Sequence, residues 1–101
     1  LPSQMRGRAL EEMSRALRRN SSAILTLWSR RALKIRPDAR CIEGEASGDF
    51  MIPWRTPRGA EERYYHLYTA GEARREIMES PLTLRSIFEE GLNIVAILER
   101  E

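Results

Sequence analysis

Cysteine and histidine are almost missing from this chain, which has one of each, Cys41 and His66, among its 101 residues. A single cysteine cannot form an internal disulfide, so we expect a reducing, cytoplasmic location. One cysteine and one histidine do not supply the ligands of a zinc site, so we expect no metal. Long apolar runs are also missing: none approaches the roughly 18 residues that span a membrane, and no signal peptide is recognisable. We therefore expect no membrane partner.

Lysine is nearly absent as well, since 16 of the 17 basic residues are arginines and Lys34 is the exception. Residues 1–40 carry ten basic and three acidic side chains, net +7, whereas residues 41–101 carry seven and twelve, net −5. Arginine forms bidentate contacts with phosphate, so the basic first half is a candidate face for nucleic acid. GC-rich coding or a thermophilic host would produce the same bias, and a solvated face is the alternative.

The spacing of apolar residues predicts one α/β domain over residues 1–101. Helical spacing from Ser3 onward predicts a first helix, and the apolar run at 23–28 predicts a strand covered on both faces. Thr69 and Glu72 form a capping box, in which Thr bonds an amide and Glu reaches back to the cap, and this box opens a second helix. Extended segments are expected at 49–54 and 63–68, as a candidate hairpin, and at 82–88 and 92–98, as an antiparallel pair.

Residues 48–68 hold most of the large aromatic rings of the chain, together with three arginines and the histidine. Aromatic faces beside guanidinium groups suit a flat, anionic ligand such as a nucleotide, which can stack on a ring and pair its phosphate with arginine. Strand alternation places Arg63 and Tyr65 on one face and Tyr64 and His66 on the other, and we expect one face to be core. The alternative for any of these side chains is a packing role. The candidate substrate-binding residues are Trp54, Arg55, Arg63, Tyr64, Tyr65 and His66.

Two stretches of this segment resemble a known enzyme family. Asp49 to Trp54, which ends in Pro-Trp, and the Arg-Tyr-Tyr-His-Leu-Tyr run of residues 63–68 are similar to segments of the tRNA wobble-uridine methyltransferases. The helix around residues 8–18 and the strand at 23–28 resemble the elements that precede those segments. The chain is thus similar to the carboxy-terminal half of a class I, S-adenosylmethionine-dependent methyltransferase. The resemblance implies half of a Rossmann-like fold, with a partial sheet in two or three layers.

The resemblance also implies a function. The family methylates a carboxymethyl group on the anticodon uridine, which implies a tRNA acceptor held by Arg55 or Arg63 and stacked on Trp54, Tyr64 or Tyr65. The cofactor-binding half of the family is missing, because the six glycines stand singly and form no Gly-x-Gly loop for S-adenosylmethionine. We therefore expect a substrate-side part that neither binds the cofactor nor catalyses methyl transfer alone. Its cofactor-binding half would be encoded upstream, supplied by another polypeptide, or lost.

A stand-alone module derived from such an enzyme is the alternative function. It would bind RNA or form a homodimer, because the free flank of the 23–28 strand carries unpaired backbone groups that invite a second copy. The sequence leaves open which uridine modification is concerned and which oligomeric state the chain adopts.

Overall fold

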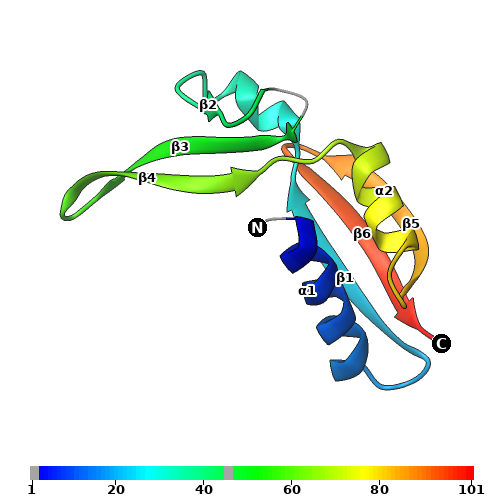
Figure 1. Cartoon of the computed structure of the whole chain (residues 1–101). Coiled ribbons are helices and arrows are strands. Elements are labelled where there is room, and N and C mark those ends of the chain that lie inside the picture. The colour runs from blue at the N-terminus through cyan, green and yellow to red at the C-terminus, as the bar shows by residue number, and fades with distance from the viewer. Residues whose placement is uncertain (1–2, 45–46) are drawn as a thin grey trace.

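The computed structural model describes residues 3–44 and 47–101 and contains two antiparallel sheets and two α-helices (Figure 1). The chain begins with a helix and one long strand, inserts a short 3₁₀ helix and a hairpin, and ends with a helix and two strands. The elements are α1 (Ser3–Ala16), β1 (Ser21–Trp28), η1 (Arg30–Lys34), β2 (Arg40–Cys41), β3 (Asp49–Thr56), β4 (Gly59–His66), α2 (Ala70–Met78), β5 (Thr83–Glu90) and β6 (Asn93–Arg100).

The first sheet has the strand order β1-β6-β5, and both helices cover one of its faces. Leu10 of α1 and Ile77 of α2 pack together with Ala96 and Leu98 of β6, which are fully buried. Alternate residues of a strand point to one face, so the neighbours of these β6 residues point to the opposite face. The predicted antiparallel pairing of the last two strands is confirmed, with Glu90 opposite Asn93 at the turn.

No helix in the described part of the chain covers the opposite face of this sheet (Figure 1). Ile24 of β1 is 72% exposed and Phe88 of β5 is 43% exposed on this side. The prediction that the 23–28 strand is covered on both faces is wrong, because burial alternates along β1. Its continuous apolar run places every second side chain on a face without a covering layer.

The second sheet has the order β2-β3-β4, and most of it is a hairpin that projects from the body of the molecule (Figure 1). The hairpin was expected, and its strands pair from Asp49 opposite His66 at the root to Thr56 opposite Gly59 at the turn. Phe50 and Ile52 are buried on one face of it, together with Leu67 just beyond β4. The projecting end is therefore anchored by a small apolar core at its root.

The expectation of a Rossmann-like half-fold is wrong. Every strand pair in the described part of the chain is antiparallel, and the single parallel contact is an isolated bridge between Ser29 and Tyr68. A doubly wound sheet requires crossover connections that return parallel strands to one sheet. Here β3 and β4 pair with each other outside the first sheet, and β5 turns back directly into β6. The structure is a small mixed α/β domain rich in strands.

Local signals set the limits of the elements. Asn20 adopts a positive φ of 63°, which allows the sharp turn from α1 into β1. At the second helix, the Thr69 side chain accepts a hydrogen bond from the Glu72 amide, as the capping box predicts. Neither α-helix in the described ranges is long and apolar enough to cross a membrane.

Candidate functional site

The only histidine lies between two carboxylates at the root of the hairpin. Nδ1 of His66 is 2.7 Å from an oxygen of Asp49, and Nε2 is 2.9 Å from an oxygen of Glu72. The His66 side chain is only 3% exposed. An imidazole donates from both ring nitrogens only when it is protonated on both, so the imidazolium form satisfies both carboxylates. The ring connects the hairpin to helix α2 through charge-assisted hydrogen bonds.

Asp49 has a second hydrogen-bond donor, the hydroxyl of Tyr64, at 2.6 Å. Burial alone would raise the pKa of Asp49, but the hydrogen bonds from Tyr64 and His66 outweigh it and hold the pKa below its ordinary value. Burial and the contact with Asp49 raise the pKa of Tyr64 to about 12. The phenol therefore stays protonated at neutral pH and keeps donating to Asp49.

A second polar group joins helix α1 to helix α2. Nε and one terminal nitrogen of Arg6 lie 3.1 and 3.2 Å from the two carboxylate oxygens of Glu76, and Tyr68 donates to Glu76 at 3.1 Å. Burial by itself would lower the pKa of Arg6, but the hydrogen bond to Glu76 and the nearby negative charges outweigh it, so the pKa is raised above its ordinary value. The Arg6 guanidinium also lies 5.7 Å from the centre of the Tyr68 ring. The two helices are thus tied together by an ion pair at the edge of a cavity.

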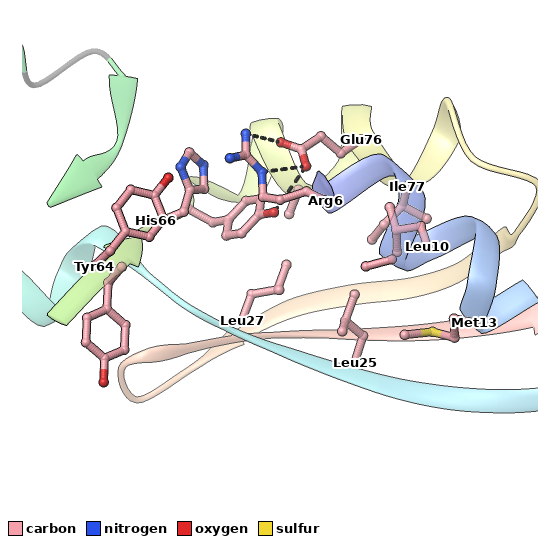
Figure 2. Close-up of a pocket in the computed structure, with 13 residues that line it drawn as sticks. Arg6, Leu10, Met13, Leu25, Leu27, Tyr64, His66, Glu76 and Ile77 are labelled. Atoms are coloured by element: carbon pink, nitrogen blue, oxygen red, sulfur yellow. Dashed lines mark hydrogen bonds and ion pairs between the residues drawn. The ribbon is translucent and has the colours of Figure 1, made fainter. Parts of the chain in front are cut away.

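This cavity has a volume of about 320 Å³ and lies between α1, α2 and β1 (Figure 2). Leu25 and Leu27 point into it from β1, while Leu10 and Ile77 line it from the helices. Its polar groups gather at one end, where Figure 2 shows Arg6 with Glu76 and, beside them, His66. A pocket with apolar walls and a few polar groups at one end is the usual form of a small-molecule or ring-binding site.

Glu72 forms only one of the two hydrogen bonds of the predicted capping box. Its amide bonds Thr69 as expected, but one carboxylate oxygen bonds His66 instead of reaching back to the cap. The other oxygen, Oε1, is buried and has no hydrogen-bond partner among the described residues. A negative side chain in the first turn is favourable for the helix, because it faces the positive end of the helix dipole.

The side chains of His66, Glu72 and Glu76 each bring a potential metal-ligand atom within 4.8 Å of the others. These atoms already have protein partners: Glu76 bonds Arg6 and Tyr68, and His66 bonds Glu72. The positive charge of Arg6 occupies the position where a cation would balance Glu76. The donor set therefore fits an internal ion-pair network better than a metal site.

Two of the candidate substrate-binding residues, Trp54 and Tyr65, lie on the packed face of the hairpin. The Tyr65 ring meets Trp28 edge to face at a centroid distance of 5.1 Å, and Trp54 lies 6.0 Å from Tyr65. The Arg36 guanidinium covers Trp54 at 4.7 Å from the ring centre. These rings are engaged with one another, whereas Tyr64, on the other face of the hairpin, is 38% exposed.

Arg55 and Arg63, also predicted as substrate contacts, lie on opposite faces of the hairpin. Arg63 pairs with Ile52 and shares its face, whereas Arg55 is three residues from Ile52 and therefore points to the other face. Both are exposed, as is Arg58 in the hairpin turn. The Arg58 backbone amide donates to the Thr56 hydroxyl at 3.2 Å, but within residues 3–44 and 47–101 the guanidinium groups of these three arginines form no hydrogen bond or ion pair. Of the predicted residues, the structure thus brings Tyr64 and His66 together through Asp49, and separates the two arginines from them.

The sequence pattern predicted no site role for Asp49, Glu76 or Arg6, and gave Glu72 only a role as a helix cap. Two local signals could have identified Asp49 and Glu72. Asp49 begins the 49–54 segment and lies opposite His66 in the hairpin, and Glu72 belongs to the capping box. Arg6 and Glu76 are 70 residues apart in the sequence, and no local pattern announces their pairing.

No described protein family and no curated protein matches this sequence. Two chains among the solved structures match the fold. One of them is the PH0226 protein from Pyrococcus horikoshii OT3, with a TM-score of 0.68 and 9% sequence identity. The match covers 97% of this chain and 48% of that chain, so the present fold spans about half the length of this neighbour. At such low identity the likeness shows the fold alone.

Proposed function

We propose that this chain is the acceptor-binding part of a methyltransferase-like protein that acts on tRNA, with the projecting hairpin as its RNA-binding element. The observation that carries the proposal is the presence of three exposed arginines, Arg55, Arg58 and Arg63, on a hairpin that extends from the body, with guanidinium groups that have no partner among the residues the structure describes. Free guanidinium groups on both faces of a narrow ribbon are available to the phosphates of a nucleic acid that passes along it.

The root of the hairpin supports the same role. Tyr64 presents an accessible ring at the polar end of the cavity, and its hydroxyl is fixed by Asp49. An unstacked base of a single-stranded loop can lie against such a ring, since RNA recognition usually targets bases that are splayed out of the helix. In this arrangement the arginines position the backbone, and Tyr64 contacts the base.

In this proposal, methyl transfer depends on a cofactor-binding half that would be encoded upstream, supplied by another polypeptide, or lost. The chain offers only single glycines and no loop of closely spaced backbone amides for S-adenosylmethionine. A carboxylate acceptor is already nucleophilic at neutral pH, so the acceptor side needs to supply alignment rather than a base. We therefore expect no turnover when the isolated chain is mixed with labelled S-adenosylmethionine and tRNA.

The proposal is tested by fluorescence anisotropy with a labelled anticodon stem-loop RNA. The hairpin variant R55A/R58A/R63A is compared with the helix variant R8A/R74A/R75A, which removes three exposed arginines from α1 and α2 and therefore changes the net charge equally. We expect the hairpin variant to lose about tenfold or more in affinity and the helix variant to lose little. Equal losses in the two variants, or no RNA binding by the unmodified chain, would contradict the proposal.

A further inference from the structure

Strand β1 leaves part of its backbone unpaired at the edge of the first sheet. Among the described strands its ladder partner is β6, and the hydrogen bond from the Ser29 amide to Leu92 continues that ladder beyond its end. In an antiparallel pair, alternate residues exchange hydrogen bonds with the neighbour and the residues between them point away. The backbone carbonyl of Trp28 points away from β6, since it accepts a hydrogen bond from the Tyr68 amide. By the same alternation, Ser22, Ile24 and Thr26 direct their backbone groups outward.

The two edges of this sheet differ in their protection against further pairing. Strand β5, at the other edge, has a register irregularity between Leu84 and Ser86 and carries charged residues, including Arg85 and Glu89. Strand β1 has an unbroken register with β6 and contains no charged residue and no proline in its eight residues. Soluble proteins normally guard an exposed edge with charges, prolines or bulges, and an unguarded edge is a template for another strand.

We propose that two copies of this chain pair antiparallel through β1, with Ile24 on the two-fold axis. The outward residues are arranged symmetrically about Ile24, with Ser22 on one side and Thr26 on the other. In the paired state Ile24 lies opposite Ile24 of the second copy, and Ser22 lies opposite Thr26. Hydroxyl side chains directly opposite each other can hydrogen-bond across strands, so this edge is complementary to itself.

The pairing buries side chains on both faces of the joined sheet. On the open face it covers Ile24, the most exposed large apolar side chain of β1, at 72%. On the helix-covered face, the same register places Leu25 opposite Ala23 of the second copy, next to the cavity that Leu25 and Leu27 line. The second copy thus extends the apolar floor of the cavity, and the two cavities lie on either side of the interface. This self-association is independent of the RNA-binding proposal.

The register is tested by disulfide cross-linking in a Cys41→Ser background, which removes the one native, exposed cysteine. A hydrogen-bonded antiparallel pair has a Cα separation of about 5.5 Å, within the range that a disulfide spans. Ile24→Cys is therefore expected to form a covalent dimer under mild oxidation. Thr26→Cys alone is not expected to do so, because its two copies would be separated by roughly 14 Å along the strands. A mixture of Ser22→Cys and Thr26→Cys chains is expected to cross-link.

Sedimentation of the full chain across micromolar concentrations tests the association itself. We expect a dimer that dissociates on dilution, and we expect Ile24→Arg to be monomeric at concentrations where Phe88→Arg, a matched change on β5, remains dimeric. Circular dichroism confirms that both variants are folded. A monomer at all concentrations, or equal cross-linking of the Ile24→Cys and Thr26→Cys chains, would overturn the proposal, because the edge would then be free or paired in another register.

Discussion

Asp49 and His66 stand opposite each other in the first register pair of the hairpin, and their side chains meet at 2.7 Å. The other nitrogen of the same imidazole bonds Glu72 in the first turn of α2. One buried ring therefore connects the second sheet to a helix that packs on the first sheet. We infer that this ring fixes the direction in which the hairpin leaves the body.

Replacing His66 by alanine should destabilise the protein by about 1–3 kcal/mol, because it takes one hydrogen-bond donor away from each of the partly buried carboxylates of Asp49 and Glu72. Urea unfolding followed by circular dichroism measures this change. The control is Arg85→Ala on β5, which breaks ion pairs with Glu99 of β6 and with Glu101 at the surface and should barely change the midpoint. Similar midpoints for the two variants would show that the histidine is not a structural link.

Gly48→Ala should be strongly unfavourable. Gly48 has a φ of 76°, and an added Cβ would lie 2.8 Å from the Leu67 carbonyl oxygen and 3.0 Å from the His66 ring. We expect a loss of about 2 kcal/mol or more, from backbone strain and overpacking together. Gly7→Ala is the matched control: it lies in the exposed part of α1, meets nothing within 4 Å, and should stabilise the helix by about 1 kcal/mol. Destabilisation by both changes would contradict this account of Gly48.

Asp49→Asn should change the acid limb of the stability curve. The folded-state pKa of Asp49 lies below its ordinary value of 3.8. Its stabilising contribution is therefore present above about pH 4 and is lost as the pH falls through the folded-state pKa. We expect the variant to be less stable than the unmodified chain at neutral pH, with a difference that shrinks on acidification. Thermal unfolding between pH 2 and 7 measures this difference, and a gap that stays constant with pH would argue against an ionised Asp49 at the hairpin root.

Tyr64→Phe should remove an alkaline titration step. The Tyr64 pKa is raised from 10.0 to about 12, so its stabilising contribution is complete below pH 10 and is lost as the pH rises toward 12. Absorbance titration of phenolate in the two proteins should differ by one group with a midpoint near 12. If the titration step that the variant lacks lies near pH 10 instead, the Tyr64 hydroxyl does not bond Asp49 in solution.

The sequence predicted those elements whose signals are local. The capping residue Thr69, the candidate hairpin and the antiparallel pair of the last two strands each depend on signals within a short stretch, and each is found in the structure. The burial of β1 was misjudged, because the apolar run of residues 23–28 is equally compatible with a covered strand and with an edge strand. Nothing in the run itself reveals that the face with Ile24 is open.

The fold class and most of the site depend on contacts between distant residues. The antiparallel arrangement of both sheets is decided by which strands meet, and the resemblance suggested a parallel arrangement that the pairing does not have. His66 was recognised as a candidate, but its two carboxylate partners come from another strand and from a helix. The pairing of Arg6 with Glu76 depends on α1 and α2 packing on the same sheet face. Such contacts follow from tertiary packing, which propensity and spacing do not encode.

The most direct test of the acceptor-binding claim is the salt dependence of RNA affinity, measured with the same labelled stem-loop for the unmodified chain and for R55A/R58A/R63A. Each phosphate contact contributes about 0.7 to the slope of log affinity against log salt for a single-stranded ligand. If all three hairpin arginines contact phosphates, the triple variant should lose about 2 from the slope as well as affinity. An unchanged slope would show that the hairpin does not hold the RNA backbone, and would contradict the account.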